Sequence, residues 1–237
     1  MKLCVLGGAG ARSAFLTKSL AVSAASIGVD ELVLMDTDEQ HLKTYGAIAL
    51  EIAARIDPNL RCLVTSSAEE ALSGADYVIT TIRAGGDAGR VFDERTCLEH
   101  GVLGQETTGA GGFAMALRSV PTLLFYCALA RRVAHPGHLI FNFTNPSGII
   151  TQALRSQGYQ NVYGICDAPS GFIRQLEEIL GVRAGELEID CYGLNHYSFF
   201  RNARVHGKSV QRELLENPET YTRSEMRLFT PEQVELN

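Results

Sequence analysis

The stretch VLGGAGARS, residues 5–13, constrains the fold of this chain more than any other. It follows a short apolar strand pattern at 2–6 and precedes an apolar helical pattern at 14–27. A glycine-rich turn between a strand and a helix lets backbone N–H groups approach a pyrophosphate at the helix N-terminus. Gly8, Gly10 and Ser13 take the three positions of a G-x-G-x-x-S turn. The alternative is a tight turn that only packs the helix on a sheet.

Strand and helix patterns continue to alternate after this turn. Strand patterns lie at 31–35, 60–65 and 75–81, with a helical pattern at 41–56. This alternation predicts right-handed βαβ units and a doubly wound, Rossmann-like parallel sheet of the lactate/malate dehydrogenase type. Asp36 ends the second strand pattern, where a carboxylate can bond an adenosine ribose. Gly8, Gly10, Ser13 and Asp36 therefore predict an NAD site, with NAD favoured over NADP.

The middle of the chain changes character and then returns to alternation. The glycine-rich segment 83–112 has little strand pattern and predicts a loop with a binding surface. A helix is expected at 113–134, a strand at 138–143, a helix from 147 and a strand ending in GICD, whereas 186–206 predicts antiparallel strands. We therefore expect an NAD-binding domain at 1–190 and the beginning of a second, α+β domain at 191–237.

Charge and cysteine usage exclude several classes of protein. The net charge of −6 argues against a nucleic-acid partner. Six cysteines without a CxxC pair or close Cys/His spacing argue against a disulfide framework or a zinc ribbon. No apolar run approaches the length of a membrane span. We therefore expect a cytoplasmic protein that acts on a small molecule, without a membrane partner.

Candidate binding side chains fall in the glycine-rich segment and after the strand at 138–143. Arginine forks such as those of Arg83 and Arg90 suit phosphate, although surface ion pairs would also explain them. Asn142 and Asn145 stand at a strand end, where amides can hold sugar hydroxyls or face a nicotinamide. Asn-Pro is also a plain turn signal. Glu106, among glycines, could steer a neighbouring base or a polar ligand.

Cys166 and His196 form a second candidate site, each at a strand end. Thiolate and imidazole are good ligands for a divalent transition metal, and two protein ligands would leave positions open for substrate oxygens. A buried thiol and a core histidine are the alternative.

The motifs GGAGARS, GRVFDER, GQETTGAGGFAMALRS, NFTNPSG, GICDAPSG and GLNHYSFF occur in this order. Together they resemble glycoside hydrolase family 4, the NAD- and manganese-dependent glycosidases, many of which are 6-phospho-β-glucosidases. The resemblance covers essentially the whole chain. It implies that Cys166 and His196 bind Mn²⁺ and that Arg90 and Asn145 contact a phosphorylated sugar.

Two further roles follow from the resemblance. Glu106 would lie near the catalytic base, and Asp167 matches the position of the general acid in the α-selective members. The implied reaction is an exception to the two-carboxylate rule of glycosidases. NAD⁺ takes a hydride from sugar C3, a base removes the C2 proton, the C1 leaving group departs, water adds and the hydride returns. The metal stabilises the developing enolate, and NAD is recycled in each turnover.

Family members are longer, and the tyrosine that serves as their base lies beyond residue 237. We therefore expect a C-terminally truncated chain with reduced or no activity, whose exposed apolar surface favours a homo-oligomer. Should it prove active, Tyr192, Tyr197 and Tyr221 are candidate bases. We favour β- over α-glycosides; glucose against galactose, and the need for the 6-phosphate, stay open. The alternatives are an α-selective glycosidase, a lactate/malate-type dehydrogenase and a non-catalytic NAD-binding protein.

Overall fold

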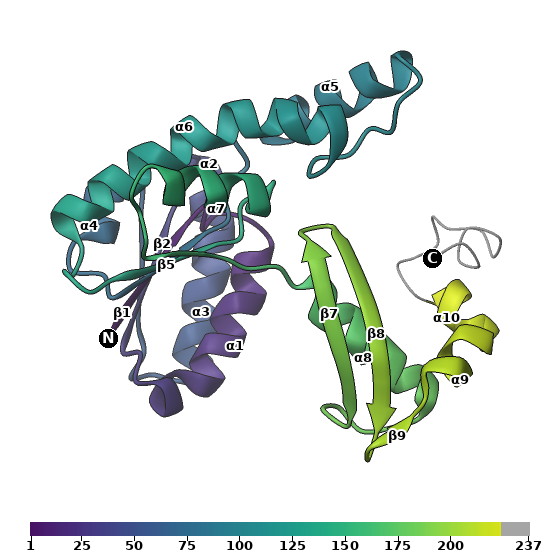
Figure 1. Ribbon diagram of the computed structural model, residues 1–237. Helices are drawn as coiled ribbons and strands as arrows, with labels where there is room; N and C mark the ends of the chain where they lie inside the picture. The colour runs from purple at the N-terminus through teal and green to yellow at the C-terminus, as the bar shows by residue number, and fades with distance from the viewer. Residues whose placement is uncertain (224–237) are drawn as a thin grey trace. The chain divides into compact units, whose positions relative to one another are not determined.

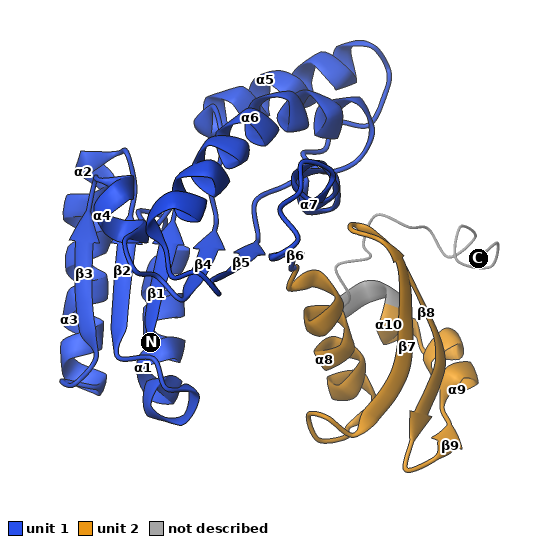
Figure 2. Ribbon diagram, turned by 60° about the vertical axis from the view of Figure 1, so that its left-hand side comes forward, with its two compact units in different colours: residues 1–165 blue, residues 166–237 orange. Residues whose placement is uncertain are grey.

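The computed structural model describes residues 1–223 and divides into two compact units. Unit 1 spans Met1–Ile165 and unit 2 begins at Cys166 (Figure 2). We predicted a domain boundary after residue 190, a position that lies inside strand β7 (Leu187–Leu194). The structure divides the chain after Ile165. Because β7 pairs with β8 (Tyr197–Val205), and not with the large sheet, it belongs to the second unit together with helix α8 (Ala168–Leu180).

Unit 1 is built on a six-stranded parallel sheet (Figure 1). The strands lie in the order β3-β2-β1-β4-β5-β6, so the winding reverses between β1 and β4. Ligands of doubly wound folds bind at the carboxyl ends of the strands, at this reversal. The predicted Rossmann-like fold is confirmed. The strands are β1 (Lys2–Leu6), β2 (Glu31–Met35), β3 (Arg61–Thr65), β4 (Tyr77–Thr80), β5 (Leu139–Asn142) and β6 (Val162–Gly164).

Helices cover both faces of this sheet. Alternation within β1 shows why: Leu3 and Val5 join a core with α1 and α3, whereas Cys4 and Leu6 join a core with α4, α6 and α7. A strand buried on both faces needs apolar residues at successive positions. The helices are α1 (Arg12–Ile27), α2 (Glu39–His41), the π-helical turn η1 (Leu42–Gly46), α3 (Ala47–Ile56), α4 (Ala68–Leu72), α5 (Gly86–Glu99), α6 (Gly109–Val133) and α7 (Ser147–Ser156).

The expected loop at 83–112 is wrong, because the structure forms α5 there and starts α6 at Gly109. Its glycines lowered the expected helix propensity. Two of them lie against Arg118 of α6: a Cβ on Gly85, which also has a φ of +85°, would lie 3.0 Å from the Arg118 Nε, and a Cβ on Gly89 would lie 3.4 Å from its Nη2. The guanidinium thus lies on the glycine face of α5 and pairs there with the buried Asp93.

Helix α6 spans 25 residues and, by length and composition alone, could cross a membrane. The expectation that no apolar run reaches that length was therefore wrong. In the structure, Leu123, Cys127 and Ala130 bury one face of α6 in the core of unit 1. A helix in the core of a protein satisfies the same two criteria, so length and composition do not by themselves indicate a membrane span.

Unit 2 packs α8 against a small antiparallel sheet. β7, β8 and β9 (Lys208–Ser209) pair in that order, which confirms the antiparallel strands predicted at 186–206. Leu176, Leu187, Ala203 and Leu214 form its core. Two short helices follow, α9 (Gln211–Glu216) and α10 (Pro218–Arg223).

Candidate active site

The first two glycines of the turn after β1 are required by packing. Gly7 has a φ of +89°, and a Cβ there would lie 2.7 Å from the carbonyl carbon of Thr81. A Cβ on Gly8 would lie 2.9 Å from the Cβ of Leu34. The N–H groups of both glycines donate to the Met35 carbonyl oxygen, at 2.9 and 2.8 Å. The turn is therefore fixed against β2 and β4, and the sequence pattern did not single out Gly7.

Gly10 differs, because no heavy atom lies within 4 Å of the position that its Cβ would take. α1 begins just after it, and the N-cap residue Ala11 makes no side-chain capping bond. The Asp36 carboxylate accepts a hydrogen bond from the Ala9 N–H at 3.1 Å, beside the turn. Ser13 is buried at the position where the fingerprint needs close helix–sheet packing. Open space at the start of α1 and a flanking carboxylate fit a dinucleotide.

Asn142, at the carboxyl end of β5, is fully buried, and its side-chain amide hydrogen-bonds to neighbouring groups of unit 1. Its Oδ1 accepts hydrogen bonds from the Thr80 hydroxyl at 2.9 Å and from the Thr144 N–H at 3.3 Å. Its Nδ2 donates to the carbonyl oxygens of Thr144 and Ser147, both at 3.3 Å. Asn142 therefore shapes the turn that carries Asn145, which makes it a positioning residue.

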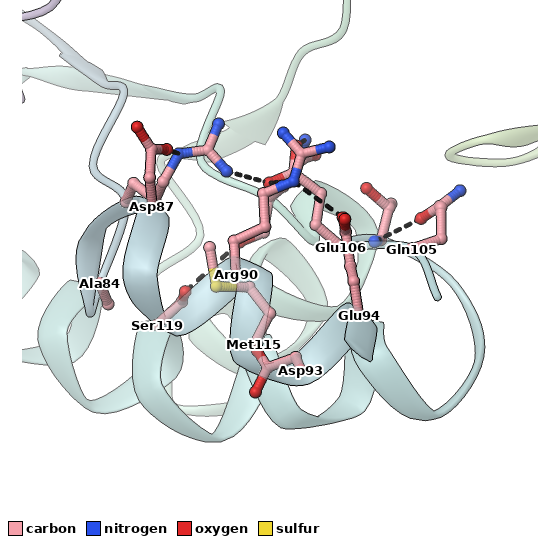
Figure 3. A network of polar contacts seen from close by, with 12 residues as sticks. Ala84, Asp87, Arg90, Asp93, Glu94, Gln105, Glu106, Met115 and Ser119 are labelled. Atoms are coloured by element: carbon pink, nitrogen blue, oxygen red, sulfur yellow. Dashed lines mark hydrogen bonds and ion pairs between the residues drawn. The ribbon is translucent and has the colours of Figure 1, made fainter. Parts of the chain in front are cut away.

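Glu106 lies at the centre of a polar cluster to which three other chain segments contribute (Figure 3). Arg83, just after β4, donates from Nη1 to its Oε2 in a short ion pair. Asn145, just after β5, donates from Nδ2 to its Oε1 at 3.2 Å. Arg90 of α5 has its Nε 3.8 Å from the same carboxylate. The structure thus brings Glu106, Arg90 and Asn145 together as predicted site residues, and adds Arg83.

The backbone around Glu106 is packed too tightly for side chains. A Cβ on Gly104 would lie 2.4 Å from a carbonyl oxygen of α5, and a Cβ on Gly112 would lie 2.4 Å from the backbone of Thr107. The Gln105 side chain accepts a hydrogen bond from the Thr107 N–H. The motif GQETTGAGG is therefore a compact turn at the start of α6, and this turn fixes the position of Glu106.

Arg90 keeps one edge of its guanidinium open. Its Nε donates to Glu94 at 2.8 Å, while within residues 1–223 neither terminal nitrogen has a hydrogen-bonding partner. The bond to Glu94 raises the pKa of Arg90, and the charges of Glu106 and Asp87 add to this, so the side chain stays cationic. By contrast, Arg118 uses both terminal nitrogens on Asp93. Only Arg90 of these two presents the fork that binds an oxyanion bidentately.

Unit 2 holds the other predicted residues. Cys166 is half-buried in the segment that leads into α8, and Asp167 is the N-cap residue of that helix. His196 is exposed, with a φ of 59°, in the turn between β7 and β8. Beside it, the Asn195 Oδ1 is buried and has no hydrogen-bond partner within the described part of the chain.

The side chains of unit 2 can be compared with the ligands that protein metal sites use. Residues 1–223 contain no group of three or more His, Cys, Asp or Glu side chains that could hold an ion. A closed structural site is therefore not formed there. By side-chain type alone, the thiol of Cys166, the imidazole of His196 and the orphaned amide oxygen of Asn195 are donors that an open transition-metal site with few protein ligands can use. Tyr192 and Tyr197 are exposed, and the Tyr221 side chain lies outside the described residues.

From the sequence, Arg83 was a candidate phosphate ligand, but a surface ion pair explained it equally well. The signal that could have found it is its place directly after β4, at the carboxyl edge of the sheet. The same signal had drawn attention to Asn142 and Asn145 after β5.

The strand order and the glycine turn first place this chain in the class of doubly wound, Rossmann-like α/β proteins. The particular assignment follows from comparison: the chain belongs to family 4 of the glycosyl hydrolases, whose model matches residues 2–182. It is 36% identical to the 6-phospho-beta-glucosidase BglT of Thermotoga maritima, over 92% of this chain and 51% of that protein. The chain spans about half the length of the curated relatives it matches.

Two solved structures are also similar. The Thermotoga maritima 6-phospho-beta glucosidase with NAD and glucose-6-phosphate superposes with a TM-score of 0.83 at 35% identity, covering 93% of this chain and 53% of that one. A 6-phospho-alpha-glucosidase from gut microorganisms, in complex with NAD and Mn²⁺, gives a TM-score of 0.86 at 29% identity, covering 91% and 50%.

Proposed function

We propose that the protein hydrolyses 6-phosphorylated glycosides, preferentially β-glycosides, with NAD⁺ and a divalent cation such as Mn²⁺. The observation that carries this proposal is the open fork of Arg90 beside Glu106 and Asn145. An arginine fork next to an amide and a carboxylate suits a molecule that combines a phosphate with hydroxyl groups. The similar structure with glucose-6-phosphate supports this reading.

In this proposal the turn after β1 binds the dinucleotide. The start of α1 would face the pyrophosphate at Gly10, where there is open space, and Asp36 would bond the adenosine ribose. Gly8 and Ser13 keep the helix close to the sheet. When bound, NAD⁺ would accept a hydride from the sugar and return it, while the cation would polarise the sugar oxygens.

Cys166 and His196 would hold the cation, and Asp167 would face the leaving group. Arg90 and Asn145 would orient the phosphorylated sugar, with the phosphate on the terminal nitrogens of Arg90. Orientation of this kind lowers the entropic part of a reaction barrier. Glu106 would lie beside the catalytic base.

The test offers nitrophenyl 6-phospho-β-D-glucopyranoside, its α-anomer and the unphosphorylated analogues, each with NAD⁺ and Mn²⁺. We expect nitrophenol release from the phosphorylated β-substrate, dependence on NAD⁺, loss with a chelator and no net NADH. Arg90→Ala should raise KM for the phosphorylated substrate far more than for the plain analogue. Net accumulation of NADH would instead indicate a dehydrogenase, and equal effects on both substrates would remove Arg90 from the phosphate site.

The expected location and assembly follow from the same proposal. We propose a cytoplasmic location, where a doubly charged sugar phosphate would be retained because it does not cross a lipid bilayer unaided. Phe113, Leu117 and Phe125 are exposed at helical spacing on α6 and offer an apolar surface for a homo-oligomer. Light scattering on the purified protein measures the second expectation.

A further inference from the structure

Helix α5 carries Arg90 and Glu94 of the candidate site, yet little of this helix is anchored in the core of unit 1. Of its 14 residues, only Asp93 and Cys97 are buried. Figure 1 shows α5 beside α6 and apart from the sheet. A helix with so few buried residues depends for its position on the contacts that those residues make, and Asp93 makes a charge-assisted one.

Arg118 of α6 joins Asp93 through two parallel hydrogen bonds. Its Nη1 donates to the Asp93 Oδ1 at 3.1 Å, and its Nη2 donates to the Oδ2 in a short ion pair. Its Nε donates to the carbonyl oxygen of Ala84 at 3.3 Å. Ala84 directly follows Arg83, and Asp93 lies about one turn after Arg90 in α5. One guanidinium therefore holds both segments that carry the arginines of the site.

The next residue of α6 reaches the third segment of the site (Figure 3). Ser119 is fully buried, and its hydroxyl donates to the carbonyl oxygen of Asn145 at 3.3 Å. The Asn145 side chain donates in turn to Glu106. Arg118 and Ser119 together tie to one helix all three segments whose side chains contact Glu106.

Neither residue is placed to bind a ligand itself. Both terminal nitrogens of Arg118 donate to Asp93, and its Nη2 also lies 3.5 Å from the Sδ of Met115. Ser119 has no exposed surface. An arginine fork binds an oxyanion bidentately only in one orientation, so a residue that fixes α5 also orients the fork of Arg90.

We propose that Arg118 and Ser119 are positioning residues for the phosphate site. Arg118 orients the fork of Arg90 through α5, and Ser119 fixes the turn that carries Asn145. The inference rests on the proposed phosphate contact of Arg90. It gives a role to the last two residues of the motif GQETTGAGGFAMALRS, which the proposed reaction does not use.

The test measures the affinity for glucose 6-phosphate by calorimetry in the presence of NAD⁺. Arg118→Lys keeps the positive charge but cannot form the parallel pair with Asp93, which leaves α5 less firmly held. A charge-assisted hydrogen bond to phosphate contributes about ten- to a hundredfold in affinity, so a partly misoriented Arg90 should weaken glucose 6-phosphate binding about tenfold. The affinity for NAD⁺ alone should change by less than about twofold, because its turn makes no contact with Arg118.

Arg131→Lys is the matched control, the same substitution in the last turn of the same helix. The Arg131 Nη2 donates to the carbonyl oxygen of Gly158 at 3.2 Å, and its guanidinium lies over the ring of Tyr159. Neither partner belongs to the candidate site. This variant should leave both affinities unchanged.

A double-mutant cycle separates positioning from a general loss of structure. In the Arg90→Ala background, Arg118→Lys should change glucose 6-phosphate binding by less than about twofold, because the fork that it orients is gone. Ser119→Ala should weaken binding about two- to tenfold in the wild type and have no effect in the Asn145→Ala background. Thermal unfolding of each variant confirms that it is folded.

The outcomes separate this inference from the function on which it rests. If Arg90→Ala weakens binding but Arg118→Lys does not, or if Arg118→Lys weakens it equally with and without Arg90, the inference is wrong. Should Arg118→Lys not fold, Asp93→Asn, which weakens the same pair from the other side, decides in its place. If Arg90→Ala leaves the affinity unchanged, or the wild type binds no glucose 6-phosphate, the phosphate site itself is wrong.

The role of Ser119 is decided by its own cycle. If Ser119→Ala leaves the wild-type affinity unchanged, or weakens binding equally in the Asn145→Ala background, Ser119 does not act through Asn145 and this part of the inference is wrong.

Discussion

Gly8 and Gly10 lie in one turn, yet alanine should affect them in opposite ways. In Gly8→Ala the new methyl would lie 2.9 Å from the backbone nitrogen of Met35 and from the Cβ of Leu34, atoms that cannot rotate away. Overpacking of this kind costs about 1–3 kcal/mol, which lowers Tm by roughly 2–4 °C per kcal/mol in a unit of this size. Gly10→Ala meets open space and no positive φ, so it should leave stability unchanged or raise it by about 0.4–1 kcal/mol.

For the affinity of NAD⁺ we expect the opposite order, with the larger effect at Gly10. A methyl on Gly10 occupies the space in which the pyrophosphate would accept N–H bonds, and a lost hydrogen bond to a charged group costs about 1.5–3 kcal/mol. NAD⁺ affinity should therefore fall roughly ten- to a hundredfold in Gly10→Ala, measured by calorimetry, while its melting curve matches the wild type. Gly137→Ala, at the opposite edge of the sheet just before β5, is the control and should change neither property. Wild-type NAD⁺ affinity in a folded Gly10→Ala variant would refute the assignment of the turn.

Three further outcomes are expected. Asp36→Ala should weaken NAD⁺ binding by about tenfold, through the lost ribose bond and the freed Ala9 N–H; unchanged calorimetric affinity would contradict this. Cys166→Ser should abolish Mn²⁺-dependent activity and leave NAD⁺ binding nearly intact, and activity that survives a chelator would disprove the metal role. Burial raises the pKa of Cys4 to about 12, which suppresses its reactive thiolate at pH 8. Iodoacetamide should therefore modify the exposed Cys191 and spare Cys4 until the protein unfolds or the pH approaches 12, as peptide mass spectrometry can show.

The sequence was informative wherever the signal is local. A strand, a glycine turn and a helix follow one another within residues 2–27, and the carboxylate of Asp36 stands directly after the next strand. Backbone geometry and burial on both faces of a parallel sheet impose these patterns over a few residues, so they can be read without the fold. The cofactor turn and the class of fold, a doubly wound parallel sheet, were predicted for this reason, and the family motifs named Arg90, Glu106 and Asn145 without placing them.

Only the tertiary structure decided what surrounds those side chains. Glu106 meets Arg83 across 23 residues of chain and Asn145 across 39, and neither pairing leaves a periodic trace in the sequence. The same holds for α5, where packing on Arg118 overrides the low helix propensity of the glycines. Contacts between distant segments depend on how helices and strands pack, and packing is a property of the whole fold. The sequence therefore determined which side chains line the site, and the fold determined that one carboxylate stands between two arginines.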